Sequence, residues 1–234
     1  MRATVIIPVR TRSFEFHSNE IEEGESVLRF IVRRCSGLDD LRVVMLIDSY
    51  DLFLKVRDAG FVECYLVECL SSDVDMCYRW AGNIDTESLV IVPPSEILID
   101  SRDLNRLIDC NGLSGNSVTT LDREFYAGEH CDRRIVKLQK HLWGGVYCFT
   151  RSPLFTSDCL FRKHIPVYSL SVECLKKIGG LIPTNNGFME MIDCVSWIEN
   201  GVSVRSLSTN GYYLTLNTEE NFLKCKNYMG YEKI

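Results

Sequence analysis

Residues 3–13, ATVIIPVRTRS, decide how this chain is expected to fold. The first seven, 3–9, are almost all apolar, and the loop after them carries Arg10, Arg12 and Ser13. A continuous apolar run without polar alternation predicts a strand buried on both faces of a parallel sheet. Arginines directly after such a strand lie at the sheet edge where α/β proteins bind ligands. The stretch therefore indicates a loop of the kind that handles phosphate, although no glycine follows and the next charges are acidic.

Strand and helix patterns alternate up to residue 122. Apolar runs predict further strands, and segments with helical spacing between them predict helices, with Ser26 and Ser49 as N-caps. The expected strands are 42–48, 63–68, 88–94 and 116–122, and the expected helices are 25–35, 49–60, 71–84 and 100–110. Such alternation predicts a doubly wound, mostly parallel Rossmann-like sheet with helices on both faces.

The second half of the chain has a less regular pattern. Residues 133–155 predict two strands and a turn, a hairpin that extends the sheet with antiparallel strands. The expectations that follow are a helix over 188–201, strands over 202–208 and 212–217, and a helix over 218–229 capped by Thr218. No repeat, linker or low-complexity segment divides the chain, so we expect a single domain over 1–234.

Composition excludes several classes of protein. The formal net charge of −6 argues against nucleic-acid binding. No run approaches the roughly 20 apolar residues of a membrane span, and charges that begin at Arg2 argue against a signal peptide. We therefore expect a cytoplasmic protein that binds no membrane. The eleven cysteines include no C-x-x-C pair and are expected to be reduced and buried, not metal ligands.

Seven segments, taken in order, resemble sugar nucleotidyltransferases of the cytidylyltransferase type. The families meant are the spore-coat polysaccharide F-type proteins and the 3-deoxy-manno-octulosonate cytidylyltransferases. The first four segments are VIIPVRTRS (similar to IIPAR…S-x-R), GESVLRFIVRR (GKPLL), VVMLIDS (IVVATDD) and SSDVDMCYRWAG (EDDVLDRYYQAA). The others are LVIVPPSEILIDSRDL (VVRITGDCPLIDPEL), IVKLQKHLWGGVYCFTRSPL (VVKVV…HIGIYAFRR) and ENGVSVRSL…LTLNTEENF (ENGIKIKVV…VDTPEDL).

This resemblance implies a nucleotide-diphospho-sugar transferase fold, with a nucleotide half over about 1–122 and a sugar and dimer half over about 123–234. It implies transfer of a nucleotidyl group from CTP to a sugar acid in surface-glycan or activated-sugar biosynthesis, with Mg²⁺ as cofactor and a homodimer as the assembly. The residues that it places against phosphate and nucleotide are Arg10, Arg12, Lys137, Pro8, Ser13, Asp48 and Pro94. On the sugar side it places Asp193, Gly144 and Gly145.

The metal ligands depart from the pattern of the family. The aspartate of GDCPLI corresponds to Ser95, with Glu96 beside it, and the aspartate of VDTPEDL corresponds to Asn217, or to Thr215 in a neighbouring register. Because Mg²⁺ prefers anionic oxygen ligands, a site made of Ser95, Glu96 and Asn217 is a weakened one. The resemblance thus leaves two functions open: a cytidylyltransferase, or a non-catalytic relative that binds a nucleotide, a sugar or a pathway partner.

Each of these residues also has a purely structural interpretation. Arg10 and Arg12 can be a solvated loop pair, and Lys137 a surface residue of an edge strand. Asp48 can cap a helix, Asp193 can be an exposed helix carboxylate, and the glycine pair 144–145 can form a bulge or turn.

Overall fold

The computed structural model describes residues 1–11, 19–22, 24–60, 63–69, 71–111, 116–154 and 160–231. Arg12 and Ser13, two of the predicted phosphate ligands, lie outside the described residues. Across the described ranges, no helix is both long enough and apolar enough to cross a bilayer.

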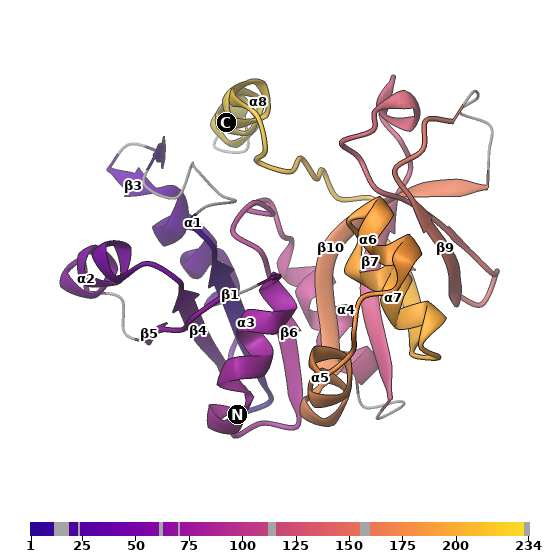
Figure 1. Cartoon of the computed structure of the whole chain (residues 1–234). Helices are drawn as coiled ribbons and strands as arrows, with labels where there is room; N and C mark the ends of the chain where they lie inside the picture. Colours follow the sequence, from indigo (N-terminus) through magenta and orange to yellow (C-terminus); the bar gives the residue numbers. More distant parts are fainter. Residues whose placement is uncertain are drawn as a thin grey trace.

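A mixed nine-stranded sheet forms the centre of the described structure (Figure 1). Its main path runs in the order β11-β7-β10-β6-β1-β4-β5, and β8 joins it through β10 and also pairs with β9. These strands are β1 (Ala3–Val9), β4 (Leu41–Ile47), β5 (Cys64–Leu66), β6 (Ser88–Ile91), β7 (Ser117–Arg123), β8 (Lys137–Lys140), β9 (Val146–Thr150), β10 (Phe161–Ser171) and β11 (Ser203–Ser208). A separate two-stranded ribbon pairs β2 (Glu20–Glu22) with β3 (Glu25–Ser26).

β1 is the strand on which the arrangement of the site depends. It pairs in parallel with β4 over its whole length and with β6 on its other side, and all seven of its residues are buried. The carboxyl ends of β1, β4 and β6 therefore meet at one edge of the sheet, as the apolar runs predicted. β10 is antiparallel to β6, β7 and β8, which confirms the antiparallel part expected in the second half of the chain.

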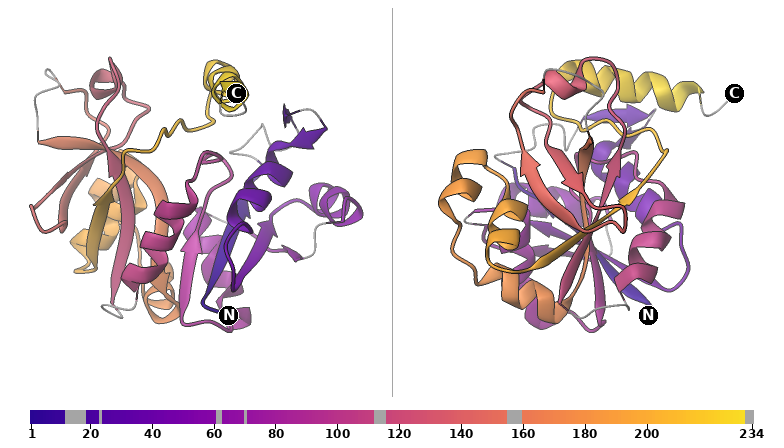
Figure 2. Two further views of the ribbon diagram at one scale, coloured as in Figure 1. Left: turned by 180° about the vertical axis from the view of Figure 1, so that it is seen from behind. Right: turned by 90° about the vertical axis from the view of Figure 1, so that its right-hand side faces the viewer.

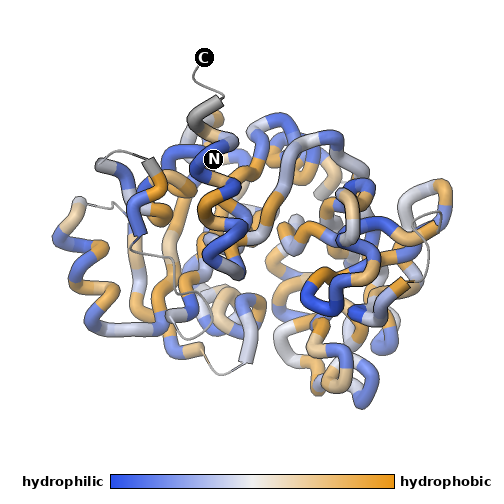
Figure 3. Tube along the Cα trace, turned by 90° about the horizontal axis from the view of Figure 1, so that it is seen from above, coloured by the Kyte–Doolittle hydropathy of each residue, from blue (hydrophilic) through white to orange (hydrophobic). Residues whose placement is uncertain are grey.

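Helices cover both faces of the sheet (Figure 2, right). One core lies under α1 (Val27–Cys35), α2 (Tyr50–Asp58), α4 (Ser101–Asn111) and α8 (Glu219–Tyr231). The other lies under α3 (Asp73–Trp80), α5 (Val172–Gly179) and α7 (Asp193–Glu199). Figure 3 shows hydrophilic and hydrophobic stretches alternating along the helices, as expected where only one side of a helix packs on a sheet.

Most boundaries in the first half agree with the predictions because local chemistry sets them. The hydroxyl groups of Ser26 and Ser49 accept hydrogen bonds from Arg29 N and Leu52 N, both at 3.4 Å, and cap α1 and α2. Thr218 likewise caps α8, through a hydrogen bond of 3.2 Å from Asn221 N. The predicted hairpin over 133–155 is confirmed as the antiparallel pair β8 and β9.

The β2–β3 ribbon had no counterpart in the predictions, and most of the other errors lie in the second half. The single helix predicted over 188–201 is two helices, α6 (Asn185–Glu190) and α7, because Met191 adopts a left-handed conformation with φ of 54°. Residues 212–217 were predicted as a strand but form none; Tyr213 and Leu214 are buried beside α8 as an irregular segment. β10 and α5 had no counterpart in the predictions. Two short 3-10 turns, Ala81–Asn83 and Glu129–Cys131, complete the described elements.

A buried carboxylate fastens β7, β8, β10 and β11 to one another. Asp122 is fully buried at the end of β7 and accepts hydrogen bonds from Lys140 Nζ, Arg162 Nε and Ser206 Oγ. Burial favours a raised pKa for Asp122, but these hydrogen bonds outweigh it, so the pKa is lowered and the group stays charged. The antiparallel part of the sheet thus depends on one paired buried charge.

We expect Asp122→Asn to lower the free energy of unfolding by about 3–5 kcal/mol, because it leaves Lys140 and Arg162 without their buried partner. Urea unfolding followed by circular dichroism measures this. Asp109→Asn is the control, because it removes an exposed carboxylate paired with Arg2 and is expected to cost about 0–1 kcal/mol. Equal losses for the two variants would contradict the role assigned to Asp122.

Candidate functional site

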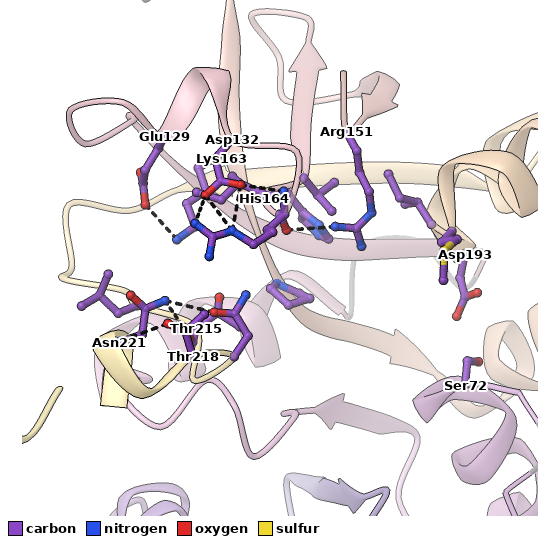
Figure 4. Close-up of a pocket in the computed structure, with 18 of the residues that line it drawn as sticks. Ser72, Glu129, Asp132, Arg151, Lys163, His164, Asp193, Thr215, Thr218 and Asn221 are labelled. Carbon is purple, nitrogen blue, oxygen red and sulfur yellow. Dashed lines mark hydrogen bonds and ion pairs between the residues drawn. The ribbon is translucent and has the colours of Figure 1, made fainter. Parts of the chain in front are cut away.

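A cleft of about 1520 Å³ opens beyond the carboxyl end of β1, between α6, α7, β10 and the segment that leads into α8 (Figure 4). Polar and charged side chains from distant parts of the chain line it. They include Arg10, Ser72, Glu129, Asp132, Arg134, Arg151, Lys163, His164, Tyr168, Asp193, Thr215, Asn217 and Asn221. In Figure 4, Ser72 and Asp193 lie at one end, whereas Lys163, Glu129, Thr215 and Asn221 lie at the other.

The first end is organised around Arg10, and we call Arg10, Ser72, Asp73 and Asp193 the Arg10 cluster. Arg10 follows β1 directly, donates from Nη2 to the Ser71 carbonyl at 2.8 Å, and places Nη1 3.6 Å from Asp73 Oδ1. Asp73 is the first residue of α3, which Ser72 caps by accepting from Asp75 N at 3.2 Å. The arginine is therefore held by the start of a helix that begins at the same sheet edge.

The two carboxylates of the Arg10 cluster share one electrostatic environment. Burial raises the pKa of Asp73 to about 6, against the opposing effect of Arg10, and the nearby Asp193 adds to the increase. The pKa of Asp193 is also raised, because protein atoms crowd it, while a hydrogen bond with the Ser72 side chain and the charge of Arg10 oppose the rise. Asp193 is exposed and lines the cleft, so its carboxylate oxygens can accept hydrogen bonds there.

The opposite end of the cleft holds a cluster of paired charges. Arg123 donates to both carboxylate oxygens of Glu129 at 2.7 Å, and Lys163 Nζ lies 3.2 Å from Glu129 Oε1. Lys163 is 5% exposed, and burial together with the neighbouring Arg123 lowers its pKa. The guanidinium of Arg123 lies over the Tyr126 ring, and Tyr126, Tyr212 and Tyr228 stack in series. This stack joins the cleft wall to α8.

His164 and Tyr168 of β10 line the cleft and were missed as site residues. The sequence contains a pattern that could have identified them. HIPVYSL (164–170) has the same His-x-x-x-Tyr spacing as the family segment HIGIYAF. HLWGGVYCF (141–149), the segment compared with it above, has two more residues between its histidine and its tyrosine. Thr120 Oγ1 lies 3.0 Å from His164 Nε2 and also hydrogen-bonds the Ile165 and Val167 carbonyls. The Thr120 hydroxyl group can donate to one of these carbonyls and accept from His164 Nε2.

Arg151, at the end of the hairpin, is a third missed residue. Its Nε donates to the Glu190 carbonyl at 3.0 Å and its Nη1 to the Arg134 carbonyl at 2.9 Å. These main-chain contacts fix the guanidinium at the cleft without neutralising its charge. The basic residue predicted in this region, Lys137, is instead fully buried and donates to the Asp132 and Arg151 carbonyls at 2.6 and 3.2 Å. Lys137 therefore supports the loop that carries Arg151 and does not line the cleft.

The other predicted ligand contacts lie in several places. Pro8 is buried within β1, and Pro94 is buried in the turn after β6. Asp48 accepts hydrogen bonds from Thr11 N at 2.9 Å and Thr11 Oγ1 at 2.8 Å, so it holds the start of the loop after β1. The glycine pair lies in the β8–β9 turn, where Gly144 has φ of +93° and a Cβ would come 3.2 Å from the Ser206 carbonyl. That turn packs on β11 and does not line the cleft.

The two segments that carry the predicted metal ligands lie next to each other in the fold, but their side chains do not form a site made of carboxylates. Leu216 N donates to the Ser95 carbonyl at 2.9 Å, which brings the segments of Ser95 and Asn217 together. Asn217 Oδ1 accepts from Asn221 Nδ2 at 3.1 Å. Glu96 is 1% exposed, hydrogen-bonds Thr215 and acts electrostatically on Lys163, and its Oε1 has no hydrogen-bond partner in the described ranges.

These donors do not fit Mg²⁺ bound through carboxylates. Ser95 and Asn217 contribute neutral oxygens, and Glu96, the acid next to Ser95, is buried near Lys163 and Arg123, where burial raises its pKa. Across the residues that the structure describes, no group of three or more His, Cys, Asp or Glu side chains could hold a metal ion. The ten described cysteines are all free thiols. The expected burial holds for five of them (Cys35, Cys77, Cys174, Cys194 and Cys225), whereas four are half-buried and Cys131 is exposed.

Solved structures identify the class of fold. A CMP:2-keto-3-deoxy-manno-octonic acid synthetase complexed with CTP superposes with a TM-score of 0.87 at 17% identity, covering 98% of this chain and 99% of that one. A 4-diphosphocytidyl-2C-methyl-D-erythritol synthase from Anaerococcus prevotii matches with a TM-score of 0.63 at 12% identity, over 97% and 96% of the two chains. The chain has the nucleotide-diphospho-sugar transferase fold, which confirms the predicted fold class.

Curated relatives narrow the resemblance within that class. The 3-deoxy-manno-octulosonate cytidylyltransferase of Acidobacterium capsulatum is 22% identical over 224 residues, covering 92% of this chain and 91% of the relative. That of Chlorobium limicola is 25% identical over 244 residues, covering 94% of each. No family model matches the chain. The chain thus resembles cytidylyltransferase-type nucleotidyltransferases over nearly its whole length, as its motifs predicted.

The buried His164 makes the stability of the protein depend on pH. Burial lowers its pKa to about 3, whereas an unfolded histidine titrates near pH 6.5. The unfolded chain therefore binds the extra proton first, and stability present above pH 6.5 is lost as the pH falls. Between about pH 6 and 4 we expect the free energy of unfolding to fall more steeply in the wild type than in His164→Gln, by up to about 1.4 kcal/mol per pH unit.

Urea unfolding at several pH values in this range measures the two slopes. His141→Gln, at an exposed position in the β8–β9 turn, is the control and is expected to keep the slope of the wild type. A His164→Gln slope as steep as that of the wild type would show that His164 is not held neutral.

Proposed function

We propose that this protein is a cytidylyltransferase-like protein of surface-glycan or activated-sugar biosynthesis, which binds CTP and a sugar acid in the described cleft. The observation that carries the proposal is the full-length resemblance to 3-deoxy-manno-octulosonate cytidylyltransferases together with the fold of a CTP-bound synthetase. The place of the cleft, beyond the carboxyl ends of parallel strands, is where such sheets bind nucleotides.

The charges of the cleft support both substrates. Arg10 lies directly after the first strand, so its positive charge would attract a phosphate group that binds at this edge of the sheet. Arg151 offers a guanidinium held by main-chain oxygens, suited to the carboxylate of a sugar acid. Asp193, His164 and Tyr168 line the cleft and together supply hydrogen-bonding groups for sugar hydroxyls. The sugar hydroxyl would then attack the α-phosphate of CTP and form a C–O–P ester, while the bond from the α-phosphorus to the bridging oxygen breaks, pyrophosphate leaves and the hydroxyl proton passes to solvent.

The residues at the predicted metal position favour a second candidate function, that of a relative that binds CTP and a sugar acid without transferring the nucleotide. Mg²⁺ would supply positive charge at the α-phosphate, but Ser95 and Asn217 are neutral and Glu96 faces Lys163 and Arg123. The loss of one group that stabilises charge in a transition state commonly costs a factor of about 10² to 10³ in rate. The loss of two carboxylates is therefore compatible with binding and unfavourable for turnover.

We expect CTP to bind the wild-type protein, and pyrophosphate release with CTP and 3-deoxy-manno-octulosonate to be slow or absent. Calorimetry with CTP, in EDTA and in Mg²⁺, and a coupled pyrophosphate assay make the two measurements. Binding that Mg²⁺ strengthens, with rapid release, would establish the enzyme and remove the non-catalytic candidate. No CTP binding under either condition would overturn the proposal.

We further expect the double variant Ser95→Asp with Asn217→Asp to bind a divalent ion more tightly than the wild type, because the main chains at 95 and 216 are in contact. Electron paramagnetic resonance with Mn²⁺ as the probe gives the affinity directly. Ser101→Asp with Asn210→Asp adds the same charge at two exposed positions and is the matched control. Equal Mn²⁺ affinity in the two double variants would show that 95 and 217 do not form the metal position.

The homodimer expected from the resemblance stays a prediction, which light scattering on the purified full chain would test.

A further inference from the structure

Arg10, the described arginine of the loop after β1, is already engaged inside the protein. Its Nη1 lies 3.6 Å from Asp73 Oδ1 and its Nη2 donates to the Ser71 carbonyl at 2.8 Å. Both acceptors belong to the start of α3, so the guanidinium is held at two points against one element. A phosphate that binds Arg10 must replace the Asp73 carboxylate or share the arginine with it.

We propose that Asp73 competes with the phosphate groups of the nucleotide for Arg10 and thereby sets how tightly the cleft holds a polyphosphate. The proposal rests on the proposed function, because it assumes that phosphate groups enter this end of the cleft. It makes Asp73 a positioning residue that acts through Arg10. No step of it requires a metal ion.

The place of Asp73 explains why its charge matters. Its side chain is 28% exposed, and it stands at the first position of α3 directly above the end of β1. Asp193 reaches the same region from α7, so a phosphate beside Arg10 would meet two carboxylates and one guanidinium. Removing the charge of Asp73 leaves the shape of the cleft intact and shifts this balance toward anions.

Competition of this kind depends on pH in a defined direction. Burial raises the pKa of Asp73 to about 6, so the carboxylate is largely charged at pH 7.5 and largely neutral at pH 5. His164 stays neutral over this range because its pKa is about 3. The charged or titratable groups that act on Asp73, or on which it acts, are Arg10 from β1, Asp48 after β4, Asp193 from α7, Tyr168 from β10, and Cys69 and Cys77 next to and within α3.

The test compares Asp73→Asn with the wild type by calorimetry, using CTP and inorganic tripolyphosphate as probes in EDTA at pH 7.5 and pH 5.0. At pH 7.5 we expect Asp73→Asn to bind both probes about tenfold more tightly. At pH 5.0 the ratio of the two dissociation constants is expected to fall toward one. The ratio cancels the protonation of the probe itself, which is the same for both proteins.

Two further variants make the comparison specific. Asp51→Asn removes the same charge from the first turn of α2, an exposed position at the start of the neighbouring helix, and is expected to change neither affinity by more than about twofold. Asp73→Ser keeps a residue suited to the start of a helix, and serves as the second test should Asp73→Asn fold poorly.

The outcomes separate this inference from the proposed function. A gain in tripolyphosphate binding without any CTP binding supports the role of Asp73 and overturns the cytidylyltransferase proposal. CTP binding that is equal in wild type and Asp73 variants overturns the role of Asp73 alone. A gain that is the same at both pH values, or that Asp51→Asn reproduces, also overturns it, as does the absence of binding of either probe to every variant.

Discussion

Parallel pairing of β1 with β4 on one side and β6 on the other is the constraint on which the site depends. Because the three strands run in the same direction, Arg10, Asp48 and the turn at 93–96 all emerge at one sheet edge. Asp48 then holds Thr11, and α3 begins where its first residue can reach Arg10. The contacts of the Arg10 cluster therefore follow from the direction of the strands and from the position where α3 begins, and they do not require a long loop.

The antiparallel strand β10 supplies the other wall. It passes between β6 and β7, and residues 168–171 pair with β6 while residues 163–165 pair with β7 beyond the last residue of β6. Because of this offset, Lys163 and His164 lie beyond the carboxyl end of β6, where they line the cleft together with Arg151. Asp122 of β7 accepts hydrogen bonds from Lys140 of β8 and Arg162 of β10, and so holds these three strands together. The cleft is therefore a junction between a parallel half, which carries Arg10, and an antiparallel half, which carries Arg151 and Lys163.

Sequence reasoning predicted the parts of the molecule that local chemistry controls. β1, β4 and β6 are largely apolar runs, and Ser26, Ser49 and Thr218 are caps, so each of these features can be identified from a few neighbouring residues. β10, the longest of the described strands, was missed because RKHIPVYS begins with three basic residues and includes a proline, features that do not indicate a central strand. The break at Met191 was missed because a left-handed residue other than glycine leaves little trace in periodicity. Arg151 went unrecognised because tertiary pairing, not sequence spacing, brings it to the cleft, whereas His164 and Tyr168 were missed because the family segment HIGIYAF was matched to HLWGGVYCF instead of HIPVYSL.

The apolar core and the charges of the cleft follow different constraints, which is why the fold agrees with the solved structures while positions 95 and 217 lack the carboxylates that the sequence resemblance implies. Burial in β1, β4 and β6 accepts Val, Ile or Leu at each position with small energetic cost, so the fold tolerates identities near 20%. A carboxylate that binds a metal tolerates no such exchange, since an amide or hydroxyl of similar size lacks the charge. At Ser95 and Asn217 negative charge is absent, and at Asp73 it stands beside the arginine of the first loop. A metal-free triphosphate would then meet a cleft in which part of the positive charge is already neutralised, so the electrostatics of a few side chains, and not the architecture, decide whether this cleft can transfer a nucleotide.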